Sequence, residues 1–182
     1  SEMIDKYYAR YGQSGSVQAV EIGFAFAFGP HRISGYVDRV DRLPNGKLEL
    51  IDYKTGQAMS KADAENDLQL ALYDLAFCHD DDLRALGQPG LASYLYPKNI
   101  GARANGKRSY VPTDESRERL RTRVAYYSEA ILAERFPPHG AVSEVIPPSD
   151  PDEVDRALRR DPCRFCAFKW ICPETEREGT DG

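Results

Sequence analysis

Three side chains in the first third of the sequence have the types that bind a divalent metal ion and act on a phosphate: Asp38, Asp52 and Lys54. Two carboxylates, with the backbone carbonyl of Tyr53, are the hard oxygen ligands that Mg²⁺ and Mn²⁺ prefer. A cation held there would lower the pKa of a bound water and neutralise charge developing on a phosphate. The lysine ammonium would orient or deprotonate that water and stabilise the transition state. Taken alone, Asp-x-Lys fits an exposed salt bridge, and such bridges contribute little to stability.

A predicted β-hairpin brings these residues together. The sequence predicts strands at residues 32–41 and 47–55, separated by Pro44-Asn45-Gly46, a strong hairpin signal. Folding about this turn places Asp38 opposite Asp52 or the residue after it. Because side chains alternate between the faces of a strand, the lysine projects from the same side as Asp52. Burying both acids costs free energy unless they are paired or bind a metal ion, which favours a metal site.

The helix predicted after this hairpin adds two polar residues. Ser60 and Asp63 match a capping box, and the helix is predicted to run to about Cys78. Gln69 and Tyr73 are spaced i, i+4 and therefore lie on one face. They fit boundary residues beside an apolar stripe, or a hydrogen-bonding platform for the carboxylates or for a DNA backbone.

The remaining pattern predicts an α/β (α+β) fold. Besides the hairpin and the helix after it, the pattern predicts two helices, at residues 2–11 and 113–135, and three strands, at residues 20–28, 91–96 and 107–111. The last two of these strands are expected to pair with each other. We expect a core at residues 1–146 and, packed on it, a Pro-rich tail at 147–182 that carries three cysteines.

The composition excludes a uniformly basic surface, because the net charge is −5. A local basic stretch remains, and it fits either a phosphate-contacting DNA-binding arm or a solvated Gly-rich hairpin loop: Lys98, Arg103, Lys107 and Arg108. The sequence has no apolar run long enough to cross a bilayer and no signal-peptide pattern, so a cytoplasmic, soluble protein is expected.

Three motifs in this order resemble the RecB-type branch of the PD-(D/E)XK nuclease superfamily. They are Gly35-Tyr36-Val37-Asp38-Arg39-Val40-Asp41, Ile51-Asp52-Tyr53-Lys54-Thr55-Gly56 and Gln69-x3-Tyr73. The resemblance spans roughly the whole chain and implies a restriction-endonuclease-like core, a central mixed β-sheet flanked by helices. It also implies an exonuclease or endonuclease that acts on single-stranded DNA or DNA ends with Mg²⁺ or Mn²⁺.

The resemblance also implies roles for single residues. Asp38 and Asp52 would be metal ligands, the Tyr53 carbonyl a third ligand, and Lys54 catalytic, while Gln69 and Tyr73 would support them. Glu21 resembles a recurrent acid of the preceding strand whose role is not defined.

The tail cysteines extend this resemblance. Cys163, Cys166 and Cys172 resemble the last three ligands of the iron–sulfur cluster found in a subset of this branch. A 4Fe–4S cluster needs four thiolates, and no cysteine precedes Cys78, which is expected to be a small buried hydrophobe. Zinc held by the three cysteines and a histidine, and unligated thiols, are the alternatives.

The chain departs from the family's pattern in a second way. The family's metal site usually takes a histidine from a helix before the first strand, whereas the first histidine here is His31, in a predicted turn after that strand. Both departures predict an N-terminally truncated fragment with weak metal binding and poor cleavage. We expect its parent to be a helicase–nuclease of DNA double-strand-break repair and recombination, with a helicase domain or subunit as partner. The alternatives are a stand-alone nuclease of CRISPR adaptation and a non-catalytic DNA-binding module of the same fold.

Overall fold

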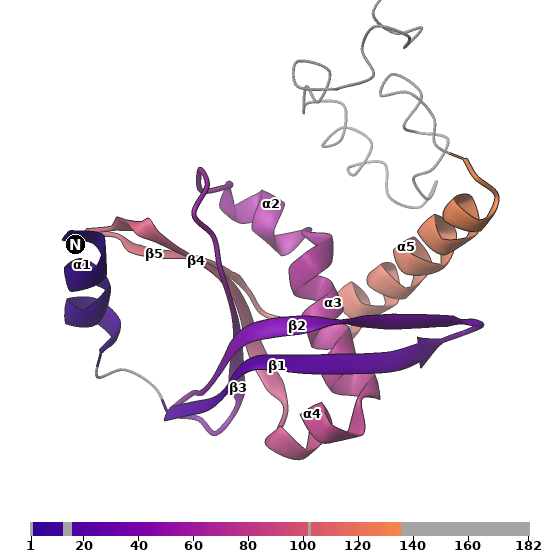
Figure 1. Ribbon diagram of the computed structural model, residues 1–182, viewed down its shortest axis with the longest axis horizontal. Helices are drawn as coiled ribbons and strands as arrows, with labels where there is room; N and C mark the ends of the chain where they lie inside the picture. Colours follow the sequence, from indigo (N-terminus) through magenta and orange to yellow (C-terminus); the bar gives the residue numbers. More distant parts are fainter. Residues whose placement is uncertain (1, 13–15, 102, 136–182) are drawn as a thin grey trace, which may run out of the picture. The chain divides into compact units, whose positions relative to one another are not determined.

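The computed structural model describes residues 2–12, 16–101 and 103–135. These residues form five helices and five strands, in an order that Figure 1 shows. The chain divides into two compact units, one of residues 1–120 and one that begins at Arg121. The elements are α1 (Glu2–Tyr11), β1 (Ser16–Phe28), β2 (His31–Arg42), β3 (Leu48–Tyr53), α2 (Lys61–Glu65), α3 (Leu68–His79), α4 (Asp81–Leu86), β4 (Pro89–Ile100), β5 (Asn105–Tyr110) and α5 (Asp114–Leu132).

The strands form one mixed sheet in the order β1-β2-β3-β4-β5. Neighbouring strands are antiparallel except β3 and β4, which are parallel. Parallel neighbours need a long connection, and here it contains α2, α3 and α4. The prediction of a mixed sheet flanked by helices is confirmed.

The central strand β3 carries the densest part of the core. Five of its six residues are buried, as expected for a strand covered on both faces. Helix α3 packs against β1, β3 and β4 on one face, with Leu70 and Leu75 fully buried. Helix α1 packs against β4, where Tyr7 and Tyr11 lie on a cluster that contains Ile51.

The predicted hairpin between β2 and β3 forms around Asn45 and Gly46. Leu43 N donates to the Lys47 carbonyl at 2.8 Å, and Gly46 adopts a φ of +81°, which favours glycine. The last pair of the ladder is Arg39 with Ile51, so Asp38 and Asp52 follow at the next position along each strand.

The prediction of one helix from residue 60 to about 78 is wrong, because the helix is interrupted at Asn66 and Asp67. Ser60 caps α2 as predicted, with its hydroxyl accepting from Asp63 N, but Asp67 caps a separate helix, α3. A second Asp, Asp80, caps the short helix α4, which the sequence pattern did not indicate. Two aspartates that offer their side chains to free backbone N–H groups thus divide this segment into three helices.

The end of β4 also differs from the prediction. Strand β4 continues past Pro97 to Ile100, so proline does not end it. This is tolerated because the pairing with β5 is irregular between Leu95 and Ile100, where a missing donor breaks no regular ladder.

None of the helices in the described part of the chain is long and apolar enough to cross a bilayer. The predicted tail, residues 147–182, lies outside the described residues.

Candidate metal-dependent catalytic site

Asp52 is the centre of a hydrogen-bonded group on the face of the sheet that α3 covers. The residue is only 3% exposed. Its Oδ1 accepts hydrogen bonds from Gln69 Nε2 at 2.9 Å and from the Tyr73 hydroxyl at 2.8 Å. Its Oδ2 lies 2.8 Å from the Lys54 ammonium nitrogen. The structure therefore brings together four residues that the sequence singled out: Asp52, Lys54, Gln69 and Tyr73.

Gln69 links the lysine to the aspartate. Lys54 Nζ donates to Gln69 Oε1 at 2.7 Å, and Gln69 Nε2 donates both to Asp52 and, at 2.7 Å, to the Tyr73 hydroxyl. An ammonium only donates, so the amide oxygen of Gln69 must face the lysine. Each polar atom of this amide has a defined partner, which fixes the lysine and the aspartate relative to each other.

Two residues that sequence reasoning missed complete the group. The Tyr94 hydroxyl donates to Asp67 Oδ1 at 2.6 Å and to Gln69 Oε1 at 3.2 Å, while Lys54 Nζ lies 4.8 Å from the Tyr94 ring centroid. Asp67 also caps α3 by accepting from Gln69 N. An aspartate before an apolar helical run is a capping signal that could have identified Asp67, but nothing in the sequence distinguishes Tyr94 among 11 tyrosines.

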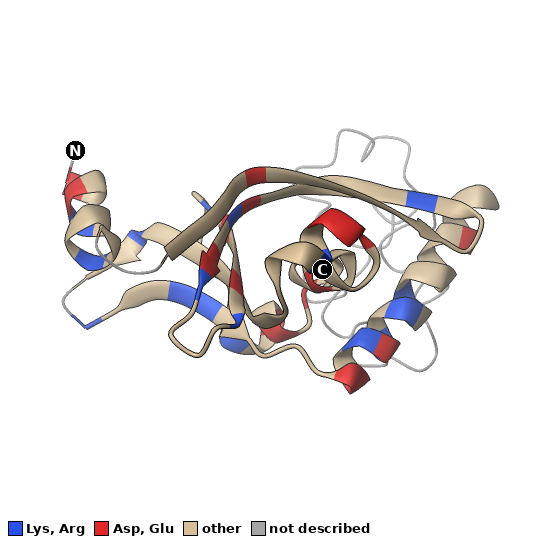
Figure 2. Cartoon of the chain, turned by 90° about the horizontal axis from the view of Figure 1, so that it is seen from below, with Lys and Arg blue, Asp and Glu red and all other residues tan. Residues whose placement is uncertain are grey.

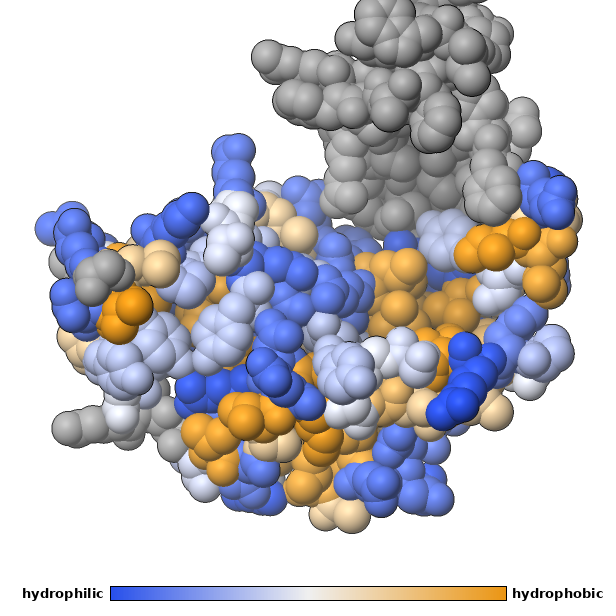
Figure 3. Space-filling view, in the orientation of Figure 1, coloured by the Kyte–Doolittle hydropathy of each residue, from blue (hydrophilic) through white to orange (hydrophobic). Residues whose placement is uncertain are grey.

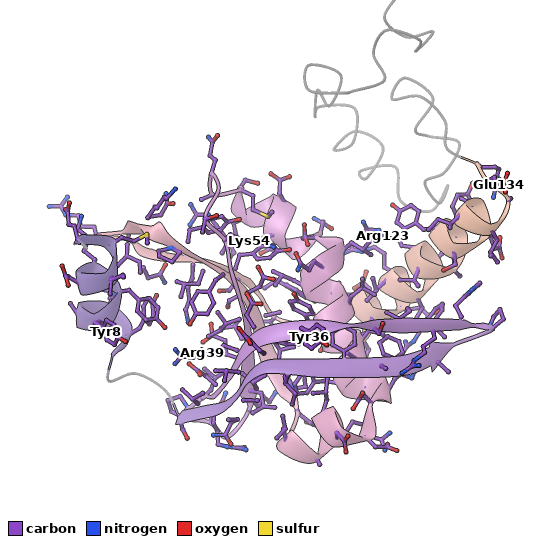
Figure 4. The ribbon with its side chains drawn as sticks, viewed as in Figure 1. Tyr8, Tyr36, Arg39, Lys54, Arg123 and Glu134 are labelled. Atoms are coloured by element: carbon purple, nitrogen blue, oxygen red, sulfur yellow. The ribbon has the colours of Figure 1, made fainter. Side chains whose placement is uncertain are left out.

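Asp38 enters the site from β2. It is half-buried, and its Oδ2 accepts a hydrogen bond from Tyr53 N at 2.9 Å, across the end of the hairpin ladder. The Tyr53 ring turns to the other face, where its hydroxyl lies 2.8 Å from that of Tyr7. Figure 4 shows this division, with Lys54 on the side of α2 and α3 and Arg39 on the side of α1.

The electrostatics of the site favour an additional cation. Burial raises the pKa of the Asp52 carboxyl above its usual range, and the nearby Asp38 charge raises it further. Lys54 and Tyr73 oppose this shift only in part. Burial and the Asp52 charge likewise raise the pKa of Tyr73, which keeps its hydroxyl protonated as a donor.

The predicted basic arm does not act as one group. Lys107 directs its ammonium to both carboxylate oxygens of Glu49, each at 2.7 Å. Arg108 donates to the backbone carbonyl of Met59 at 2.9 Å, while Lys98 and Arg103 are exposed. Figure 2 shows basic residues on strands in the left half of the view and acidic residues on the strands beside them.

Of the four cysteines, only Cys78 lies among the described residues. Cys163, Cys166 and Cys172 lie outside the described residues, so a bound cluster or zinc ion stays a prediction. Cys78 lies near the end of α3 and is half-buried.

Comparison with known proteins places the chain in a family. A profile described as PD-(D/E)XK nuclease superfamily matches residues 1–173. The chain belongs to the PD-(D/E)XK nuclease superfamily. No curated protein matches it. Among solved structures, the crystal structure of SSO0001 aligns with a TM-score of 0.42 and 18% identity, over 95% of this chain and 66% of that one. The chain thus spans about two thirds of the length of that structure.

Nucleases of the PD-(D/E)XK superfamily usually use Mg²⁺ or Mn²⁺, and the residues present fit such an ion. Oδ2 of Asp52 is buried and accepts no hydrogen bond of good geometry within the described part of the chain, so one carboxylate oxygen remains for a ligand. Across those same residues no group of three His, Cys, Asp or Glu side chains gathers. Mg²⁺ is commonly held by one or two carboxylates and otherwise by water and phosphate, so Asp38 and Asp52 suffice.

We expect Mn²⁺ or Mg²⁺ to raise the melting temperature of the wild-type protein and not that of Asp52→Asn. At a cation concentration tenfold above Kd, binding to the native state alone stabilises it by about 1.4 kcal/mol. Differential scanning fluorimetry across a metal titration measures the shift. Glu65→Gln, which removes an exposed helical carboxylate, is the control and should respond as the wild type does. Equal metal responses in Asp52→Asn and the wild type would rule out this site.

Proposed function

We propose that this chain is a nuclease domain that hydrolyses DNA phosphodiester bonds with Mg²⁺ or Mn²⁺ bound at Asp38 and Asp52. The observation that carries the proposal is the contact group of Asp52 with Lys54, Gln69 and Tyr73, formed by side chains from β3, the residue that follows it, and α3. On the face seen in Figure 3, hydrophilic residues gather where the end of β3 and the start of α2 lie in Figure 1. A hydrophilic surface of this kind suits a charged polymer.

Some residues of the site would bind the metal ion, and others would act on the phosphate. When bound, the metal ion activates a water molecule and neutralises charge on the scissile phosphate. Lys54, one third exposed and held by Gln69, presents its ammonium beside Asp52, where it stabilises charge that develops on the phosphate oxygens. Gln69 and Tyr73 donate to Asp52 Oδ1, so Oδ2, which lies beside the Lys54 ammonium, is the oxygen that would bind a ligand.

The finer assignment follows the RecB-type motifs. We propose a domain of a helicase–nuclease that trims single-stranded DNA at ends during double-strand-break repair and recombination. Its support is the order of the three motifs along the chain, with the lysine two residues after the second aspartate and the Gln-x3-Tyr pair on the following helix. The structure adds that these motifs meet at one place.

A cleavage assay tests the proposal. Under single-turnover conditions, with enzyme in excess to compensate for weak metal binding, linear single-stranded DNA labelled at either end should shorten with Mn²⁺ or Mg²⁺ and stay intact in EDTA. Circular single-stranded DNA separates end-dependent from internal cleavage. Intact linear DNA with both cations, or cleavage that persists in EDTA, would contradict the proposed activity.

A further inference from the structure

A groove beside the edge strand β5 has a volume of about 730 Å³ and carries several basic side chains. We call it the β5 groove and define it by side chains from α2, β5, the segment between β5 and α5, and α5 itself: Lys61, Arg108, Ser109, Thr113, Ser116 and Arg119. All of them belong to the first compact unit, residues 1–120.

The groove continues the catalytic face of the sheet. Asp52 pairs with Tyr94 across the β3–β4 ladder, and Tyr94 pairs with Arg108 across the β4–β5 ladder. Directly paired residues share a face, so Asp52, Tyr94 and Arg108 form a row across three strands. Arg108 lies two strand spacings from Asp52, roughly 10 Å. A nucleic-acid strand rises about 3.4 Å per nucleotide in a duplex, so this span is a few nucleotides.

The charges along this row change sign. The end at β2 and β3 carries the two aspartates of the proposed metal site, whereas the groove is lined by four basic residues and one acid: Lys61, Lys107, Arg108, Arg119 and Glu65. Lys107 is paired with Glu49, so three of the cations remain against one carboxylate. In a chain with a net charge of −5, this is a local concentration of positive charge. Lys61 and Arg119 are exposed, and the Lys61 side chain retains 76% of its exposure despite a loose, 3.6 Å contact with Glu65. The hydroxyl of Ser109 is hydrogen-bonded to that of Ser93, and those of Thr113 and Ser116 bond to each other's backbone at the start of α5. The exposed cations, rather than these hydroxyls, are therefore the groups that a ligand would meet.

A second cavity on the opposite face has a different character. It measures about 240 Å³ beside α1, and two of its three basic residues are paired with acids in the same wall. Arg39 forms two hydrogen bonds with Asp41, and Lys107 binds Glu49. The third, Arg42, donates to Gln18 and to backbone carbonyls. The basic groups of this cavity are thus committed to partners, whereas Lys61 and Arg119 of the β5 groove are exposed.

We propose that the β5 groove holds the phosphates of a single DNA strand next to the scissile phosphate, with Lys61 and Arg119 as exposed phosphate contacts and Arg108 between them and the catalytic site. This inference rests on the proposed nuclease function and assigns that function its strand path. Phosphate contacts position a strand without reading its bases, so the contacts made by Lys61 and Arg119 are independent of sequence. Arg108 also donates to the Met59 carbonyl, which ties the segment after Lys54 to the same strand.

The salt dependence of DNA binding tests the strand path. A fluorescein-labelled single-stranded oligonucleotide is titrated by anisotropy in Mg²⁺, in a Lys54→Met background that keeps the DNA intact, over a series of NaCl concentrations. Each lost phosphate contact reduces the slope of log K against log salt by about 0.7 for single strands. Lys61→Met/Arg119→Met should therefore lower the slope by about 1.4 and weaken binding roughly 20-fold at 0.1 M salt.

The matched control is Lys6→Met/Arg84→Met. Lys6 has a glutamate at i−4, much as Lys61 has one at i+4, and Arg84 is an exposed helical arginine outside the groove. The control should bind with the wild-type slope. An unchanged slope and Kd in Lys61→Met/Arg119→Met, with wild-type cleavage intact, would overturn the strand path and leave the nuclease function standing. Absence of both DNA binding and cleavage in the wild type would instead remove the function on which the inference rests. A groove that binds an extended peptide along the β5 edge, with DNA binding unaffected by the double variant, would also overturn it.

Discussion

Replacing Lys54 by methionine should lower the single-turnover cleavage rate by about 10³-fold. Lys54 is the ammonium that contacts Asp52, at 2.8 Å, and it is held in place by Gln69 and the Tyr94 ring. Methionine keeps much of the side-chain length and loses the charge. Because the substitution also leaves the buried Asp52 carboxylate without this cation, the rates are compared at temperatures where both proteins are folded by circular dichroism. Cleavage of labelled single-stranded DNA with saturating Mn²⁺ measures the effect.

A second variant separates the two roles open to this lysine. Arginine keeps the positive charge but does not lose its proton near neutral pH. If Lys54 acts by stabilising charge, Lys54→Arg should recover part of the lost rate, whereas a proton-transfer role predicts no recovery. Lys6→Met, an exposed lysine on α1, is the control and should cleave at the wild-type rate. A Lys54→Met rate within tenfold of wild type would exclude a catalytic role for this residue.

The contact group around Asp52 was predictable because its parts follow local rules. Alternation along β3 placed Asp52 and Lys54 on one side, helical spacing placed Gln69 and Tyr73 on one side, and Asn45-Gly46 set the hairpin. The structure brings these local predictions to a single place. The sequence did not indicate the contact between Tyr94 and Lys54, because that contact depends on the register in which β4 pairs in parallel with β3.

The errors also have a common physical origin. The break at Asn66 and Asp67 was missed because the apolar spacing of the helix continues across it, while Asp67 prefers to cap α3 with its own side chain. Lys107 was expected to be available to phosphate, but the register of β4 and β5 and the face shared with Glu49 give it a buried acid instead. Partner choice by a long, flexible side chain depends on tertiary contacts that no local pattern encodes.

The second large effect concerns stability. We expect Arg117→Met to destabilise the protein by about 3–5 kcal/mol, because it leaves a buried carboxylate without its guanidinium. Asp74 is 1% exposed, and Arg117 binds both of its oxygens, at 2.8 and 3.0 Å. Asp74 raises the pKa of Arg117, as expected when each charge stabilises the other. In a chain of this size the change corresponds to a fall in melting temperature of roughly 10 °C, measurable by circular dichroism.

The same pair also bears on catalysis, because Asp74 directly follows Tyr73 in α3. If the ion pair fixes the position of this helix, Arg117→Met should reduce cleavage even at temperatures where the variant is folded.

Arg84→Met is the matched control, since it breaks an exposed pair with Asp81 and should cost at most about 1 kcal/mol. Arg117→Met combined with Asp74→Leu removes both charges and should recover much of the lost stability, because the penalty comes from the isolated charge rather than from the missing bond. A double variant as unstable as Arg117→Met alone would show that packing, and not charge, holds α3 to the start of α5.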